Sequence, residues 1–158
     1  MTHPTTITAQ PGVPFVDYER EFDASPAAVY RAHIDPTLYG QWLNVDVETL
    51  EATEGGRWKY SFGASDMRMS FWGVFHTVEA NVLLIQTFEF SLAPGQVGLT
   101  ITRFEEVDGR TRMSAHEIYS SVETRDAALA SGMEHGVREG YNRLDELLAG
   151  SRAASSRT

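Results

Sequence analysis

The sequence contains no cysteine among its 158 residues. This excludes disulfide bonds, thiolate nucleophiles and zinc sites that depend on cysteine ligands. No apolar run approaches the roughly 18 residues that a membrane-spanning helix needs. Residues 1–14 have neither the apolar centre nor the basic start of a secretory signal. We therefore expect a soluble cytoplasmic protein that does not associate with membranes.

Basic residues are also scarce, because 13 Lys and Arg stand against 22 Asp and Glu, giving a formal charge of −9. Nucleic-acid binding depends on clustered basic side chains, so this balance argues against a nucleic-acid partner. The five histidines show no metal-binding spacing, and Ser120 stands where an HExxH motif beginning at His116 would need its second histidine. We expect no metal site and no cofactor.

Apolar residues are plentiful enough for one substantial core, since 42% of the chain is hydrophobic and 11% is aromatic. The length suits a single domain. We predict this domain over residues 15–149, with flexible tails at 1–14 and 150–158.

The first part of this domain predicts a strand followed by two short helices. Residues 15–23 alternate between apolar and polar side chains, which is typical of a half-buried strand. Ser25 and Pro26 then form a helix start, and a second helix begins after Asp35-Pro36.

From Val45 onward the hydrophobic pattern changes to period two. Turn residues interrupt it repeatedly, most clearly at Asp108-Gly109, which is a strong signal for a two-residue hairpin. This predicts about six further strands, and therefore an antiparallel sheet of about seven strands in total.

The chain then predicts one long helix from about Thr124, its expected cap, to Ala149. Gly132, Gly136 and Gly140 recur at every fourth position in it. A glycine inside a helix costs about 1 kcal/mol relative to alanine. On a helical projection Gly136 and Gly140 fall within the apolar side, which we expect to be buried.

Two explanations of these glycines are open at this point. They allow the helix backbone to pack closely on the sheet, or they form one wall of an internal cavity beside Met133 and Tyr141.

The order of the elements, together with several stretches of sequence, resembles a known superfamily. The stretches are SPAAVYRAHIDP, EGGRWKYSF, WGVFHTVEANVLLIQTFEF, TRFEEVDGRTRM and RDAALASGMEHGVREGYNRLDELLA. They are similar to the START-like, helix-grip (SRPBCC) proteins, and within these to the branch named after the activator of heat-shock-chaperone ATPase. The resemblance implies an α+β helix-grip fold, in which a curved antiparallel sheet wraps around a long C-terminal helix, often enclosing a hydrophobic cavity.

Aromatic residues from separate elements are the best candidates for lining such a cavity, because they stack well on flat apolar molecules. Which face of residues 69–79 points inward is open, since both faces are partly apolar. Glu89, Glu117, His76 and His116 lie on predicted strands, where one face points inward, so buried acid–base pairs are open. His116 and Glu117 are neighbours on one strand and would point to opposite faces, so they would not act as a pair. The predicted ligand-binding residues are Trp42, Trp58, Tyr60, Trp72, Phe75, Phe88, His116, Met133, Gly136, Val137, Gly140 and Tyr141.

Three functions follow from this interpretation. The first is binding of a small hydrophobic or amphipathic ligand between the sheet and the C-terminal helix, by a monomer or homodimer. The second is an enzyme of the cyclase, dehydratase or hydrolase type, which would need an inward cluster of titratable groups with shifted pKa values. No catalytic residue is identified for it. The third is a co-chaperone-like domain with a chaperone partner, which would need an exposed apolar patch.

Overall fold

The computed structural model describes the backbone of residues 3–156 and the side chains of residues 3–150. Within this part the chain forms one antiparallel sheet of eight strands, in the order β1-β2-β8-β7-β6-β5-β4-β3. The strands are β1 (Thr6–Thr8), β2 (Phe15–Phe22), β3 (Asp46–Leu50), β4 (Arg57–Phe62), β5 (Met69–Glu79), β6 (Leu83–Phe90), β7 (Ala93–Val107) and β8 (Arg110–Ile118).

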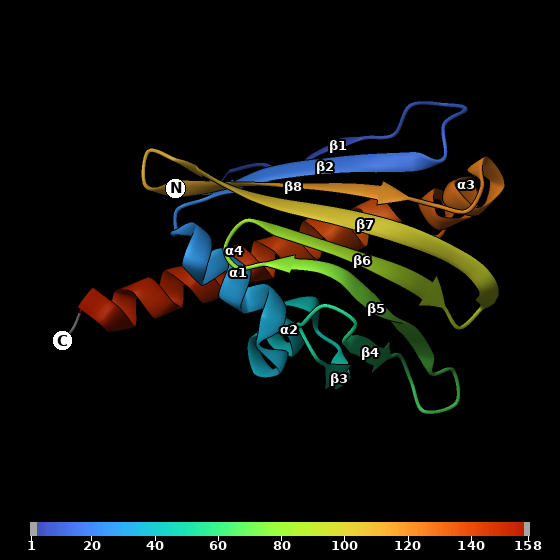
Figure 1. The fold of residues 1–158 in the computed structure, drawn as a ribbon, viewed down its shortest axis with the longest axis horizontal. Coiled ribbons are helices and arrows are strands. Elements are labelled where there is room, and N and C mark those ends of the chain that lie inside the picture. The colour runs from blue at the N-terminus through green and yellow to red at the C-terminus, as the bar shows by residue number, and fades with distance from the viewer. Residues whose placement is uncertain (1–2, 157–158) are drawn as a thin grey trace.

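Four helices complete the described chain. They are α1 (Pro26–Ile34), α2 (Pro36–Leu43), α3 (Val122–Ala130) and α4 (Met133–Ser156). The predicted α+β helix-grip fold is confirmed, and Figure 1 shows the curved sheet with the long α4 running across one side of it.

The two short helices begin where the sequence predicted them. Ser25 Oγ accepts a hydrogen bond from the N–H of Ala28 at 3.2 Å, and Pro26 occupies the first turn of α1. Asp35 Oδ1 accepts from the N–H groups of Thr37 and Leu38 at 2.9 and 3.1 Å, which caps α2. These caps satisfy backbone donors that a helix start leaves unpaired.

The eighth strand, β1, lies within the segment that the sequence analysis assigned to a tail. It pairs with β2 at the edge of the sheet. Thr5 is buried beside it, and its carbonyl oxygen accepts a hydrogen bond from Arg138 Nη1 at 2.5 Å. Three residues carry too little periodicity to indicate a strand, so only the tertiary pairing defines this one. The domain limits of 15 and 149 stay a prediction.

The single long helix expected from Thr124 onward is in fact two helices. Ser121, not Thr124, caps α3, since its Oγ accepts from the N–H of Thr124 at 3.1 Å. Gly132 separates α3 from α4 with a φ of +92°, a left-handed conformation that glycine adopts at little cost. Gly132 is therefore the turn between two helices, and it carries no helix-interior penalty.

The middle of α4 is fastened to the sheet by buried polar contacts. Arg20 on β2 is 3% exposed, and its guanidinium donates to Asn142 Oδ1 at 2.8 Å and to Asp145 Oδ2 at 3.3 Å. Leu144 and Leu148 are buried in the same part of the helix. Nearer the start of α4, Arg138 attaches the helix to the N-terminal segment through its hydrogen bond to Thr5.

The core lies between the sheet and the helices. Its largest fully buried side chains are Phe22, Phe75, Leu84, Met113, Leu144, Val16, Val29 and Thr111. Within the described residues, no helix has the length and apolar composition that crossing a membrane would require.

Two glycine substitutions should distinguish the turn at Gly132 from a position inside the helix at Gly136. A Cβ atom at Gly132 or at Gly136 would meet nothing within 4 Å, so only the backbone distinguishes the two sites. We expect Gly132→Ala to lower the free energy of unfolding by about 1–2 kcal/mol, because its φ is left-handed. We expect Gly136→Ala to raise it by about 0.5–1 kcal/mol, because alanine favours helix. Urea unfolding of both variants checks this, and equal effects would contradict the turn assignment.

Candidate functional site

A cavity of about 800 Å³ lies between the inner face of the sheet and the helices α2, α3 and α4. A volume of this size accommodates a small organic molecule. Its wall is mainly aromatic and aliphatic. All but two of the predicted ligand-binding residues line it, namely Trp42, Trp58, Tyr60, Phe75, Phe88, Met133, Gly136, Val137, Gly140 and Tyr141.

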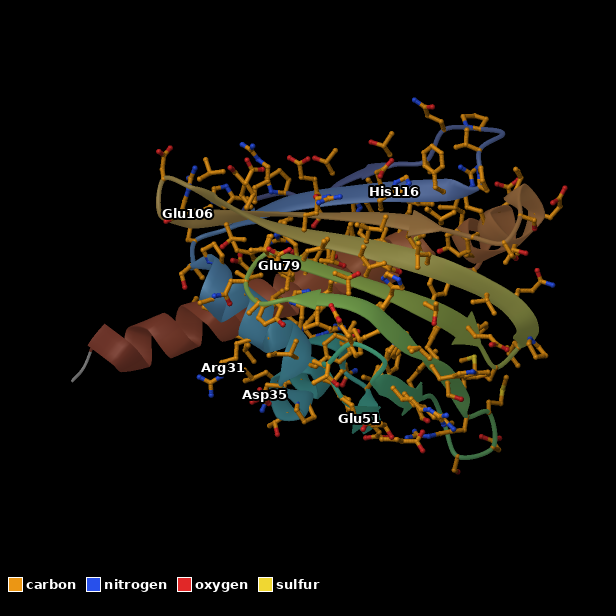
Figure 2. The ribbon with its side chains drawn as sticks, in the orientation of Figure 1. Arg31, Asp35, Glu51, Glu79, Glu106 and His116 are labelled. Carbon is orange, nitrogen blue, oxygen red and sulfur yellow. The ribbon has the colours of Figure 1, made fainter. Side chains whose placement is uncertain are left out.

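Trp72 and His116 are the two exceptions, and the prediction that they face the cavity is wrong. Successive side chains of a strand alternate between faces. Phe71 and Phe75 line the cavity, so Trp72 points to the other side of β5. His116 lies on β8 beside β2 (Figure 2), where its Nδ1 makes a 2.6 Å hydrogen bond with Asp17 Oδ1. The sequence could not resolve β5 because its outer face is also apolar.

Close packing explains one of the helix glycines, Gly140, and open space at the cavity explains another, Gly136. Gly140 is buried, and a Cβ atom there would lie 3.7 Å from the Trp42 ring, which is ordinary packing contact. Close packing therefore occurs, but against α2 and not against the sheet. Gly136 faces open space at the cavity and is exposed, so the prediction that it is buried is wrong.

Hydrogen bonds hold the two indole rings of the cavity wall in place. Trp42 Nε1 donates to the carbonyl oxygen of Ala32 at 2.8 Å, and Trp58 Nε1 donates to that of Thr87 at 3.1 Å. Tyr39 packs edge-on against Trp42 with ring centroids 5.4 Å apart. A wall of fixed rings needs little reorganisation when a flat apolar molecule enters.

Glu117 of β8 is the acidic side chain of the cavity lining. The hydroxyl groups of Tyr18 and Tyr119 donate hydrogen bonds to its two carboxylate oxygens, the latter at 2.5 Å. Burial raises the pKa of Glu117, although these hydrogen bonds and one from Thr100 act in the opposite direction. Desolvation of a carboxylate thus outweighs its hydrogen bonding here.

Five tyrosines surround this carboxyl group from different elements. Burial raises the pKa of each hydroxyl, and the nearby charge of Glu117 adds to the effect. They therefore remain neutral and serve as hydrogen-bonding groups. They are Tyr18, Tyr39, Tyr60, Tyr119 and Tyr141.

His33 of α1 lines another part of the cavity. Its Nδ1–H donates to the carbonyl oxygen of Val29 at 2.8 Å, and its ring lies 5.1 Å from the rings of both Trp42 and Phe104. Burial lowers the pKa of His33 to about 4, so the ring is neutral at pH 7 with its Nε2 lone pair free.

The predicted set included only part of the polar lining of the cavity, namely Tyr60 and Tyr141. It omitted Glu117, His33 and the tyrosines at 18, 39 and 119. One sequence signal pointed to Glu117, because it lies two positions after Ala115, which is buried on the same face of β8. Nothing local marks His33, since the packing of α1 on α2 decides its surroundings. Within the described residues, no three His, Asp or Glu side chains gather as a metal-binding group.

His33 should make folding stability depend on pH. Between about pH 6.5 and about pH 4, the unfolded chain takes up a proton on His33 that the folded protein excludes. His33 should therefore contribute a fall of about 3 kcal/mol to the free energy of unfolding across this window as the pH decreases. His33→Gln should be less stable at pH 7, because ring packing is lost, but its stability should change less across the window.

Urea unfolding at a series of pH values measures this difference. His76→Gln is the matched control, because His76 is exposed on β5. A slope for His33→Gln equal to that of the wild type would contradict the assignment of a buried neutral ring.

Known structures share this architecture. A protein from Mycobacterium smegmatis is 20% identical, with a TM-score of 0.84 over 92% of this chain and 97% of its own. A protein from Rhodobacter sphaeroides is 25% identical, with a TM-score of 0.80 over 92% and 99%. A third, from Arthrobacter aurescens, is 25% identical, with a TM-score of 0.82 over 92% and 91%.

A search of curated proteins finds no match to this sequence. The family described as "Activator of Hsp90 ATPase homolog 1-like protein" matches residues 23–149, which extend from just before α1 into α4. The chain therefore belongs to this family of the START-like (SRPBCC) superfamily, as its sequence resemblance implied.

Proposed function

We propose that this protein binds a small, mostly apolar molecule in the cavity between the sheet and α4. The observation that supports this most directly is the 800 Å³ space, which is lined by fixed aromatic rings and has a single acidic group in its wall. Apolar walls with a few well-placed polar groups are typical of sites for small molecules.

The exposed part of the lining marks an entrance. Leu92 is 70% exposed in the β6–β7 turn and lines the cavity. Ser131, Gly132 and Gly136, at the junction of α3 and α4, are exposed members of the same lining. A ligand would enter between this turn and this junction. The absence of a side chain at Gly136 keeps that route open.

A neutral fluorescent probe tests this proposal. N-phenyl-1-naphthylamine brightens in apolar surroundings, so we expect its fluorescence to rise on binding to the wild type. Gly136→Leu places a large side chain in the entrance and should weaken binding at least about tenfold, a loss of about 1.4 kcal/mol. Fluorescence titration measures the affinity.

Gly150→Leu is the matched control, because Gly150 is an exposed glycine of α4 outside the cavity lining. It should bind the probe as the wild type does. A Gly136→Leu variant that is folded, more stable and unchanged in probe binding would contradict a cavity function.

Acid–base catalysis is a second candidate function, because Glu117 and His33 both line the cavity with shifted pKa values. The Glu117 carboxylate would remove a proton from carbon beside a ligand carbonyl. The electron pair would move to the carbonyl oxygen, where a hydroxyl such as that of Tyr60 would stabilise the enolate.

Deuterium exchange into 2-tetralone, a flat apolar ketone, measures this reaction. In deuterated water, the wild type should speed exchange at the carbons beside the carbonyl at least about tenfold over Glu117→Gln, which has no carboxylate base. Equal exchange rates for the two proteins would remove this candidate and leave ligand binding in place.

A further inference from the structure

Most of the fixed N–H and O–H donors at the cavity are already used within the protein. The indole N–H groups of Trp42 and Trp58 and the Nδ1–H of His33 donate to backbone carbonyls. The hydroxyl hydrogens of Tyr18 and Tyr119 are directed to Glu117. These groups therefore cannot recognise an acceptor on a ligand.

The polar residues that line the cavity also leave hydrogen-bond acceptors unused. A carboxylate has about four acceptor positions, and Tyr18, Tyr119 and Thr100 occupy three of those on Glu117. The hydroxyl oxygens of Tyr18 and Tyr119 and His33 Nε2 also retain lone pairs. The remaining hydroxyls, such as that of Tyr60, can donate or accept and so do not discriminate between ligands.

No cation offsets Glu117 from within the described part of the chain. Lys59 belongs to the cavity lining but is exposed to solvent. The guanidinium of Arg143 donates to the carbonyl oxygens of Trp42 and Leu43 at 2.7 and 3.4 Å, at the end of α2. A buried carboxylate without a cationic partner is costly, and a cation brought by a ligand would relieve that cost.

The aromatic walls favour the same kind of ligand. The faces of tryptophan and tyrosine rings attract cations, and the attraction is stronger where water is excluded. Trp58 and Tyr60 lie together with ring centroids 5.6 Å apart, and both line the cavity that Glu117 faces. An ammonium group would thus meet a carboxylate and aromatic faces in one place.

We infer that the ligand is a hydrophobic amine, whose flat apolar body fills the aromatic part of the cavity and whose protonated nitrogen donates to Glu117. This inference rests on the proposed ligand-binding function and specifies its ligand class.

Binding of an amine should also depend on the ionisation of Glu117. The groups that face its carboxyl group are Tyr18 from β2, Tyr39 from α2, Tyr60 from β4, Thr100 from β7, Tyr119 after β8 and Tyr141 from α4. The ligand needs the charged form of Glu117, whereas burial favours the neutral form. Affinity for an amine should therefore increase as the pH rises through the raised pKa of Glu117.

Three probes with one naphthalene body test the inference by displacing N-phenyl-1-naphthylamine. They are 2-naphthylmethylamine, 2-naphthalenemethanol and 2-naphthoate, which present a cation, a neutral donor and an anion. At pH 7 we expect the amine to bind at least about tenfold more tightly than the alcohol, and the carboxylate to bind most weakly. In Glu117→Gln the advantage of the amine should disappear, while the alcohol should bind within about threefold of its wild-type affinity.

Glu106→Gln is the matched control, because it removes the same charge from an exposed position outside the cavity (Figure 2). It should keep the preference for the amine. If Glu117→Gln does not fold, the wild type alone decides, because its affinity for the amine must increase as the pH rises through the raised pKa of Glu117, while its affinity for the alcohol does not.

The outcomes separate the inference from the function on which it rests. Equal displacement by all three probes, or a preference that survives in Glu117→Gln, would overturn the amine inference and leave ligand binding intact. A failure of N-phenyl-1-naphthylamine to bind the wild type would instead count against the proposed function itself.

Discussion

The position of α4 against the sheet depends on buried polar contacts near the middle of the helix. Arg20, almost fully buried on β2, holds the helix through Asn142 and Asp145, and Leu144 packs into the core at the same level. Removing one partner of a buried ionic contact costs about 3–5 kcal/mol, so the middle of the helix is held firmly. Toward its start, α4 carries Gly136, where a Cβ atom would meet open space. The α4 residues that line the cavity all lie between Met133 and Arg143, in the first half of the helix.

The chemistry of the cavity follows from its lining, in which most of the wall is apolar and the polar groups cluster around Glu117. Aromatic and aliphatic side chains supply most of the wall, and backbone carbonyls hold the indole nitrogens of Trp42 and Trp58, so these two rings are fixed before any ligand arrives. The polar groups gather around Glu117, where tyrosine hydroxyls stabilise the carboxylate and burial opposes it. The proposed amine recognition and the proposed proton transfer would both use this carboxyl group, whereas binding of an apolar body would depend on the aromatic and aliphatic wall.

Hydrophobic periodicity predicted the fold well, but it predicted only part of the site. Alternation along the strands and the caps at Ser25 and Asp35 were sufficient to predict the order of strands and short helices, because these are local effects. The break between α3 and α4 at Gly132 was not predicted, because the residues around a glycine between two helices can look the same as those around a glycine inside one helix. Trp72 was assigned to the cavity because β5 is apolar on both faces. The placement of β1 was missed because three residues show no pattern.

The sequence by itself determined the α+β class, the family resemblance and most of the aromatic wall, because hydrophobic spacing and large rings are visible one residue at a time. Only the tertiary structure decided that Glu117 faces inward among five tyrosines and that His33 is half-buried beside Trp42. Those surroundings come from elements as far apart as β2 and α4, and no local pattern records them. The depth of burial, which shifts the pKa of both groups, is likewise a property of the packed assembly and not of any segment within it.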